Sequence, residues 1–199
     1  MRKKFISLLS ASLVLISVPA SAATVHTVAK GDTMWKIASK YQVGTSEVIS
    51  VNSHIKNPDL IYPGDKISIP KSDLSVESEE KEVVRLVNKI RVENGLSELS
   101  QDWQLSRIAR FKSQDMKDKN YFSHESPTYG SPFEMMKSFG ITYRYAAENI
   151  AKGQTSAQNV VNAWMNSSGH RKNILNPYFT KIGVGYVKSG NYWTQMFIG

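Results

Sequence analysis

The sequence predicts an α+β protein built from two domains. Three observations lead to this prediction. Residues 24–70 follow the order strand, helix, helix, strand, and residues 80–199 combine amphipathic helices with a pair of adjacent strands. Between them, residues 71–79 contain three acidic residues and three serines and little that could be buried. Helices combined with an antiparallel strand pair are typical of α+β folds.

The first 22 residues have the pattern of a cleaved secretory signal. Arg2, Lys3 and Lys4 form a basic start, and an apolar run broken only by serines follows over residues 5–18. Small residues at positions 20 and 22 fit the pattern that signal peptidase reads. A retained anchor is the alternative, but the run is short for a membrane-spanning helix. We expect a secreted protein with no transmembrane span after cleavage.

The charge and composition narrow the classes of partner. The formal net charge is +8, and residues 1–22 contribute three basic and no acidic residues, which leaves +5 for the mature chain. A mildly basic exported protein is attracted to anionic wall polymers. We do not expect nucleic acid as a partner, because no basic stripe stands out. The chain has no cysteine, so its fold depends on the core and not on disulfides.

The small domain, residues 24–70, shows short elements separated by turn chemistry. Gly44 ends the first helix, and Tyr62-Pro63-Gly64-Asp65 forms a turn before the last strand. Trp35 is flanked by Ile37 and Ala38 at helical spacing, so we expect it in the core. The expected elements are a strand at 25–28, a helix at 34–41, a helix at 45–51 and a strand at 66–70.

These elements carry a recognisable motif. The carriers are Val28-x-x-Gly31-Asp32-Thr33-x-Trp35-x-Ile37-Ala38, then Asn52, then Leu60-Ile61-Tyr62-Pro63-Gly64-Asp65-x-Ile67-x-Ile69-Pro70. This segment resembles a LysM domain, which implies a βααβ module that binds N-acetylglucosamine glycans such as peptidoglycan or chitin. A single copy implies weak affinity, because linked modules gain avidity.

The resemblance also implies where the sugar binds. It places the glycan in a shallow groove between the loop after the first strand and the loop before the last. Exposed backbone amides would meet acetamido groups there, and apolar side chains would cover the sugar ring. The alternative is that most of these residues only build turns and caps. The implied residues are Gly31, Asp32, Thr33, Met34, Pro58, Leu60, Ile61 and Tyr62.

Residues 71–79 are expected to form a flexible linker, since their composition is polar and acidic. The large domain, residues 80–199, then begins with an amphipathic helix that Gly95 ends. Ser100 is expected to cap a second helix. Ser131, Pro132 and Glu134 have the pattern of a capping box that opens a third. A fourth helix starts at Ser156, and strands at 182–187 and 192–197 follow, joined by a turn at 189–191.

Several motifs of the large domain occur together in one order. They are Phe122-Ser123-His124, Glu148-Asn149-Ile150, Trp164-x-x-Ser167-x-Gly169-His170-Arg171-x-Asn173-Ile174-Leu175 and Gly183-Val184-Gly185. They resemble the CAP superfamily of cysteine-rich secretory, antigen 5 and pathogenesis-related proteins. The resemblance implies an α-β-α sandwich with a central cleft. It places His124, Glu134, Glu148 and His170 together in that cleft.

The chemistry of these four side chains leaves alternatives open. His124 and His170 could bind a divalent metal such as zinc, with a carboxylate completing the site or acting as a base. Glu134 could instead serve only its capping box, and Glu148 could hold the loop around Asn149. His170 could be an ordinary helix-end residue. Ser123, Ser126 and Ser168 lie near the histidines, but no nucleophile-elbow pattern surrounds them.

Three functions fit the sequence. The first is a wall-associated binding protein, located in the cell wall or spore envelope of a Gram-positive bacterium, whose cleft binds a ligand or protein partner. The second is a metal-assisted hydrolase acting on wall material or protein. The third is a carrier of lipids or small apolar molecules. We rank the binding function first, hydrolysis second and lipid carriage third. The absence of an H-E-x-x-H zinc signature counts against a metalloprotease.

Overall fold

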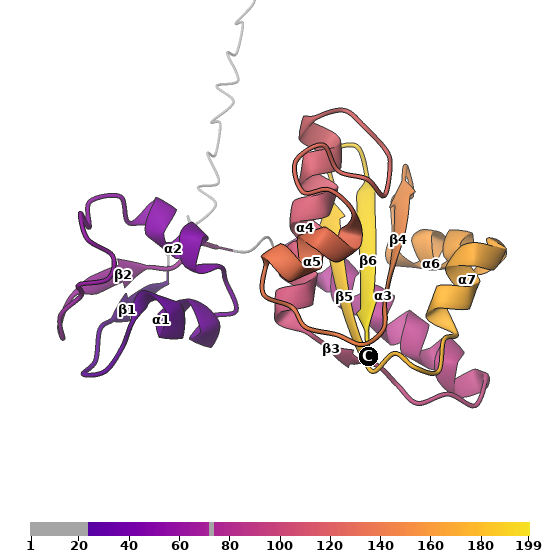
Figure 1. Ribbon diagram of the computed structural model, residues 1–199, viewed down its shortest axis with the longest axis horizontal. Coiled ribbons are helices and arrows are strands. Elements are labelled where there is room, and N and C mark those ends of the chain that lie inside the picture. The colour runs from indigo at the N-terminus through magenta and orange to yellow at the C-terminus, as the bar shows by residue number, and fades with distance from the viewer. Residues whose placement is uncertain (1–23, 72–73) are drawn as a thin grey trace, which may run out of the picture.

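The computed structural model describes residues 24–71 and 74–199, which form a small and a large domain (Figure 1). The predicted export signal at residues 1–22 lies outside the described residues. Within these ranges, no helix has the length and apolar character needed to cross a bilayer.

The small domain has the βααβ order that the sequence predicts. Its elements are β1 (Val25–Thr27), α1 (Met34–Lys40), α2 (Thr45–Val51) and β2 (Lys66–Ser68). The two strands pair antiparallel, with His26 opposite Ile67. Ile37, Val48 and Ile67 are almost fully buried and form the centre of its core.

Trp35 is not in this core, so that prediction is wrong. Its side chain is 62% exposed, while Met34, Ile37 and Ala38 are buried. Residues at spacings of three and four share one face of a helix. Met34, Ile37 and Ala38 therefore form the inward face of α1, and Trp35, one position after Met34, projects away from it.

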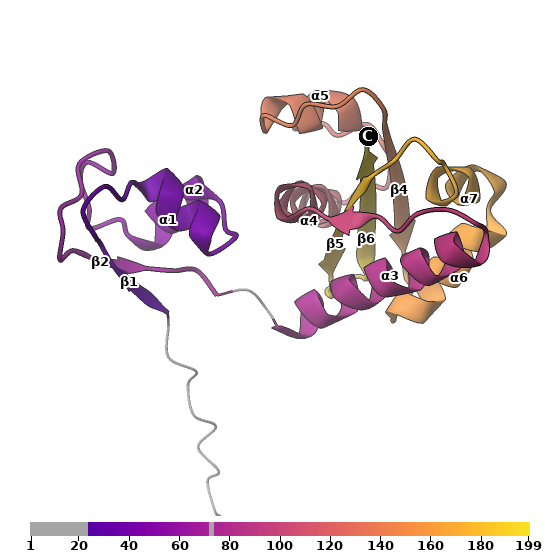
Figure 2. The ribbon, with the colours of Figure 1, turned by 90° about the horizontal axis from the view of Figure 1, so that it is seen from below.

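The large domain is a three-layer α-β-α sandwich, as the sequence predicts. Its sheet has the order β3-β5-β6-β4, with β3 parallel to β5 and the other pairs antiparallel. Helices α4 and α5 cover one face, and α3, α6 and α7 cover the other (Figures 1 and 2). The elements are α3 (Leu74–Glu93), β3 (Ser100–Gln101), α4 (Trp103–Asp118), α5 (Pro132–Ser138), β4 (Ala146–Lys152), α6 (Ala157–Asn166), α7 (Ser168–Ile174), β5 (Lys181–Val187) and β6 (Tyr192–Ile198).

Helix α4 lies directly on strand β5 because two glycines leave room for it. A Cβ atom added to Gly183 would lie 2.3 Å from the carbonyl carbon of Leu105, and one added to Gly185 would lie 2.1 Å from that of Ala109. Both distances are far below any normal contact. The Gly183-Val184-Gly185 motif is therefore explained by packing: the helix backbone occupies the space that side chains would need.

Some element boundaries differ from the sequence-based expectation. Ser100 does not cap α4; it lies in β3, and Asp102 is the N-cap, whose carboxylate accepts the Leu105 N–H. The segment around Asn149, expected as a loop, is strand β4. The capping box of Ser131 and Glu134 and the cap at Ser156 are both present as predicted.

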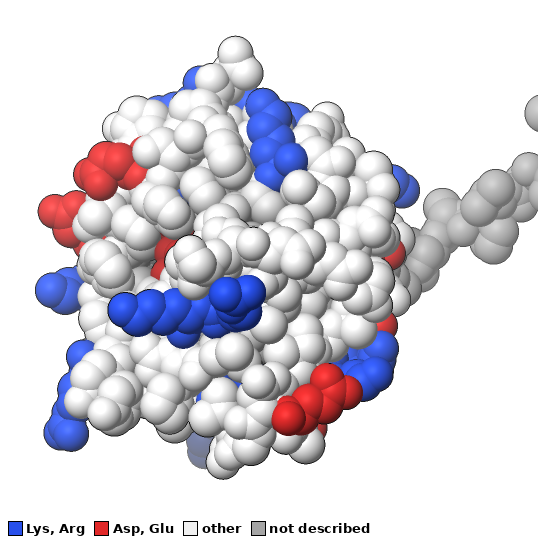
Figure 3. Space-filling model, turned by 90° about the vertical axis from the view of Figure 1, so that its right-hand side faces the viewer, with Lys and Arg blue, Asp and Glu red and all other residues white. Residues whose placement is uncertain are grey.

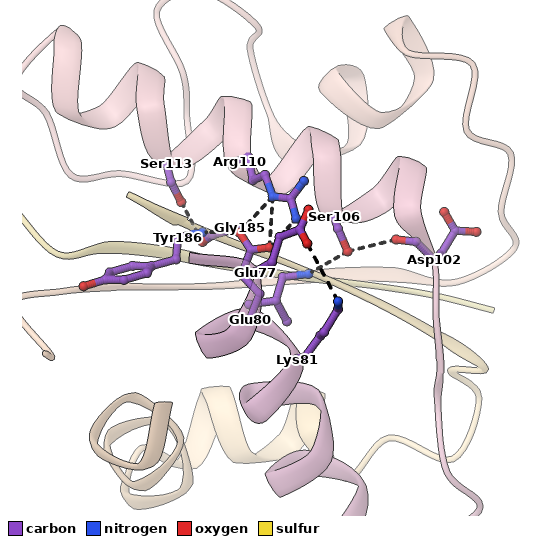
Figure 4. A network of polar contacts seen from close by, with 10 residues as sticks. Glu77, Glu80, Lys81, Asp102, Ser106, Arg110, Ser113, Gly185 and Tyr186 are labelled. Atoms are coloured by element: carbon purple, nitrogen blue, oxygen red, sulfur yellow. Dashed lines mark hydrogen bonds and ion pairs between the residues drawn. The ribbon is translucent and has the colours of Figure 1, made fainter. Parts of the chain in front are cut away.

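The segment expected to be a flexible linker is helical from Leu74 onward. Glu79 and Glu80 hold this first part of α3 on the large domain, and Figure 4 shows the contacts of Glu80. The fully buried Glu80 accepts hydrogen bonds from Arg110 at 2.9 Å and from the Tyr186 N–H at 3.0 Å. Glu79 accepts the N–H of Ala157 at 2.8 Å, at the start of α6. Glu79, the last residue of the expected linker, is thus a structural partner of α6, which composition alone does not distinguish from a linker residue.

One ion pair joins the two domains. The Nε atom of Arg107, on α4, lies 2.9 Å from a carboxylate oxygen of Glu47, on α2. The Arg107 guanidinium also lies over the rings of Phe111 and Phe139, at 4.7 and 5.4 Å from their centroids. Aromatic rings stabilise a cation in this position. Helix α4 therefore carries the contact with the small domain as well as the packing on the sheet.

We predict that Gly185→Ala lowers the free energy of unfolding of the large domain by about 1–3 kcal/mol, because the new methyl group would collide with the backbone of α4. Gly169→Ala is the matched control, since nothing lies within 4 Å of its added Cβ and alanine favours a helix. Urea unfolding of the two variants measures the difference. Equal stability of both variants would show that α4 can move away from β5 without cost.

Candidate functional site

The centre of the site is a contact between His124 and Glu148. Glu148 lies on β4 with only 6% of its surface exposed, and its Oε1 atom is 2.7 Å from the Nδ1 atom of His124. The His124 side chain, in the loop between α4 and α5, is 51% exposed. A buried carboxylate thus orients a half-exposed imidazole, which is the arrangement that fixes a histidine's tautomer in many functional sites.

The burial of Glu148 changes its pKa and leaves one of its carboxylate oxygens without a hydrogen bond. Burial raises its pKa, while the hydrogen bond with His124 and the nearby Lys112 charge act in the opposite direction. Its Oε2 atom is buried and has no hydrogen-bond partner among the described residues. An unsatisfied buried oxygen destabilises a fold, so native proteins seldom keep one without a functional reason.

His170 comes to the same region on helix α7. Asn149, next to Glu148 on β4, donates from its side chain to the His170 carbonyl at 3.2 Å. Asn173 donates to the Asn149 side-chain oxygen at 2.8 Å, so strand and helix are joined at this point. Burial, and then the charge of His124, lower the pKa of His170, which favours its neutral imidazole.

Arg91 fixes the other end of α7. Its guanidinium, 1% exposed on α3, donates to the carbonyl oxygens of Ile174 and Asn176 at 2.7 and 2.9 Å. The last carbonyls of a helix have no partner within the helix and need an outside donor. Arg91 supplies it, so the helix that carries His170 is fixed to α3 at its C-terminal end as well as to β4.

Glu134 does not join the other three predicted cleft residues. Its carboxylate accepts the N–H and the hydroxyl of Ser131, both at 2.8 Å, and it is exposed to solvent. In the described structure no hydrogen bond or ion pair links it to His124, Glu148 or His170. The capping-box alternative accounts for these hydrogen bonds, and a role of Glu134 beside the other three residues stays a prediction.

The residues present do not fit a resident catalytic zinc. Within residues 24–71 and 74–199, no three His, Asp or Glu side chains are grouped so that they could hold a metal ion. A catalytic zinc normally takes three protein ligands. His124 and His170 supply two, and the contact of the His124 Nδ1 atom with Glu148 leaves its Nε2 atom available. Metal binding therefore stays a prediction that rests on two imidazoles alone.

The nearby serines do not complete a nucleophile. The Ser126 hydroxyl donates to Asp115 at 2.7 Å, and the Ser123 hydroxyl accepts the Glu125 N–H at 3.1 Å. An activated serine would instead be hydrogen-bonded to the imidazole that takes its proton. The described contacts thus give a polar surface with two imidazoles that can exchange protons and hydrogen bonds with a ligand.

The first predicted glycan-binding loop of the small domain is held rigid by its own polar groups. Asp32 accepts the Ala29 N–H and contacts the Nε2 atom of His26, both at 2.8 Å. These two hydrogen bonds lower the pKa of Asp32, the one from Ala29 most. Thr33 caps α1 by accepting the Lys36 N–H, and Gly31 has a φ of 88°. The loop therefore presents a fixed backbone.

The second loop lies beside the first. Val28 exchanges backbone hydrogen bonds with Gly64 and Asp65, each at 2.9 Å. Leu60 and Tyr62 are 54% and 58% exposed, while Pro58 and Ile61 are partly buried. Met34 is 4% exposed and packs in the core, so its side chain cannot cover a sugar and that part of the prediction is corrected.

Sequence reasoning missed three residues that shape these sites. His26 is buried behind the Asp32 loop, and Lys112 and Asp115 are buried on α4. A signal for the last two exists in the sequence: they continue the stripe of Leu105, Ile108 and Ala109 at spacings of three and four. Charged residues on an apolar helix face indicate buried polar partners.

Charged side chains are spread over the face that carries α6 and α7 (Figure 3). Lys and Arg side chains there are separated by uncharged surface and do not form one continuous patch (Figure 3). On this face the surface is therefore unlike the basic stripe of a nucleic-acid-binding protein.

Comparison with known proteins agrees with this division. Residues 84–197 match the model of the cysteine-rich secretory protein family, and residues 26–70 match the LysM domain. The Bacillus subtilis protein YkwD is 68% identical over 125 residues, which cover 63% of this chain and 49% of that protein. SpoIVD-associated factor A of Bacillus subtilis is 49% identical over 57 residues, which cover 29% of this chain and 15% of that protein.

A solved structure shares the fold of the large domain. An extracellular protein of Bacillus anthracis that contains an SCP domain is 35% identical, with a TM-score of 0.60, and the match covers 68% of this chain and 47% of that protein. The chain thus spans about half the length, or less, of the relatives that it matches.

We predict that His170 makes the folded large domain less stable in acid. Because its pKa lies below the ordinary value of 6.5, the unfolded chain takes up the proton first, and stability falls as the pH drops below that value. His170→Gln should reduce this loss in urea unfolding at pH 7.5 and 5.5, and His54→Gln, at an exposed position of the small domain, leaves His170 in place and serves as the control. The same pH dependence in both variants would contradict the prediction.

Proposed function

The chain belongs to the cysteine-rich secretory protein family and also carries a LysM domain, and from this we propose that it is an exported protein of the cell wall. The LysM domain would bind peptidoglycan or another N-acetylglucosamine polymer. The CAP domain would present the surface around His124, Glu148 and His170 to a ligand or protein partner. The similarity to the spore coat assembly protein ExsA of Bacillus cereus, which is 44% identical over 55 residues, supports a wall or spore-envelope location.

The observation that carries the glycan-binding proposal is the pairing of a rigid loop with exposed apolar side chains. The Gly31–Thr33 turn offers backbone groups in fixed positions, since Asp32 and Thr33 are occupied by internal hydrogen bonds. Leu60 and Tyr62 stand exposed on the neighbouring loop. Exposed apolar side chains on a loop next to fixed backbone groups offer contact area to a ligand. A sugar has an apolar ring face and polar edges, which fit these two features.

For the CAP domain, the described contacts favour binding over catalysis. The imidazole of His124 is oriented by Glu148, but no described serine is hydrogen-bonded to it. A ligand that approaches this surface meets His124 and His170, which can donate or accept hydrogen bonds. No observation on the described residues favours a lipid carrier.

Hydrolysis is the second candidate function, and one observation favours it. A buried carboxylate paired with a half-exposed imidazole can act as a general base toward water. Such a reaction would need a substrate bond placed within hydrogen-bond reach of the His124 ring.

We predict that Leu60→Ala combined with Tyr62→Ala weakens retention on insoluble peptidoglycan roughly tenfold. Two apolar contacts would be lost, and tenfold corresponds to about 1.4 kcal/mol. Val51→Ala, which truncates a 48% exposed side chain on α2, is the matched control and should bind normally. Cosedimentation measures the bound fraction. Normal retention of the double variant would refute the assignment of this loop, and normal retention after deletion of residues 24–70 would refute anchoring by LysM.

A further inference from the structure

Helix α4 buries two charged side chains beneath the loop that carries His124. Lys112 is 1% exposed and Asp115 is 8% exposed, and they lie one turn apart on the helix. Buried charges strongly destabilise a fold unless they are paired and fully hydrogen-bonded. The groups that form hydrogen bonds with Lys112 and Asp115 therefore indicate the role of these two side chains. They come from the segment 121–128.

Asp115 collects three hydroxyl groups from this loop. It accepts hydrogen bonds from Tyr121 at 2.6 Å, from Ser126 at 2.7 Å and from Thr128 at 2.5 Å. Burial raises the pKa of Asp115, but these hydrogen bonds outweigh that effect and lower it overall. Hydrogen bonds to an ionised acceptor are about twice as strong as neutral ones. One carboxylate thus fixes the loop at three points.

Lys112 fixes the backbone of His124 itself. Its Nζ atom donates to the His124 carbonyl oxygen at 2.7 Å and to the Tyr121 hydroxyl at 3.3 Å. The ammonium also lies 5.1 Å from the centroid of the Tyr121 ring. The residue that carries the half-exposed imidazole is therefore held from below by a charged donor.

The far end of the loop is closed as well. Ser126 and Gly130 exchange backbone hydrogen bonds at 2.8 and 2.9 Å. Glu134 then holds Ser131, the next residue, through the capping box. From Tyr121 to Ser131 the loop is tied to α4 and to the start of α5, although it forms no regular element.

We propose that Lys112 and Asp115 are positioning residues that hold His124 against Glu148 before any ligand arrives. This inference rests on the proposed role of His124 and Glu148 as the ligand-binding surface. Without the anchor, the half-exposed imidazole would sample several orientations, and ligand binding would have to restrict them. With it, the distance of 2.7 Å between Nδ1 of His124 and Oε1 of Glu148 is set by α4.

Nuclear magnetic resonance of the mature chain tests the anchor directly. Lys112→Met removes the donor at similar length, and Lys188→Met, at an exposed position between β5 and β6, is its control. We expect amide exchange over residues 121–130 to accelerate at least tenfold in Lys112→Met, with the amides of β5 and β6 unchanged. We also expect the His124 ring proton shared with Glu148 to lose its wild-type chemical shift.

Milder variants keep the test decisive if Lys112→Met does not fold. Thr128→Val removes the hydroxyl that contacts Asp115 at constant shape, and the His124 ring signals should move away from their wild-type chemical shifts. Thr128→Ser keeps the hydroxyl, so the signals should stay at the wild-type positions. Unchanged His124 ring signals and loop exchange in folded Lys112→Met, or in Thr128→Val, would overturn the proposal. Retention on peptidoglycan should stay normal in every variant, so a failure of wall binding by the parent protein would count separately against the proposed function.

Discussion

The close packing of α4 on strand β5 is the constraint on which the rest of the structure depends. Gly183 and Gly185 allow this approach, because any side chain there would collide with the helix backbone. The charged residues of this helix make contacts with three different parts of the protein. Arg107 contacts the LysM domain, Arg110 holds the start of α3, and Lys112 with Asp115 holds the His124 loop.

The two surfaces proposed to bind ligands are built on the same principle. In each, a buried polar group fixes a loop whose outer side faces solvent: His26 behind the Asp32 loop, and Asp115 behind the His124 loop. Fixing a loop in advance reduces the conformational entropy that binding would otherwise cost. This suits a single LysM module, which has no second copy to add avidity, and it suits the binding role proposed for the surface around His124.

Much of the fold could be predicted from the sequence, and the misses have physical reasons. Helix caps such as Ser131 depend on neighbouring residues and were predictable, whereas β4 has mixed composition and is defined by its pairing with β6. The position of α3 depends on Glu80 meeting Arg110, thirty residues away in the chain. For the site, motif order pointed to His124 and Glu148, which are in contact in the structure, whereas Glu134 shares its pattern with an ordinary capping box.

The most direct test of the central claim is mass spectrometry of the soluble fraction after purified peptidoglycan is incubated with the mature protein, with and without zinc. A variant with both His124→Ala and His170→Ala is treated in the same way. We predict that the parent protein remains in the pellet and that both proteins leave the same soluble background. Fragments released by the parent but not by the double variant would contradict a binding role and make the CAP domain a wall hydrolase.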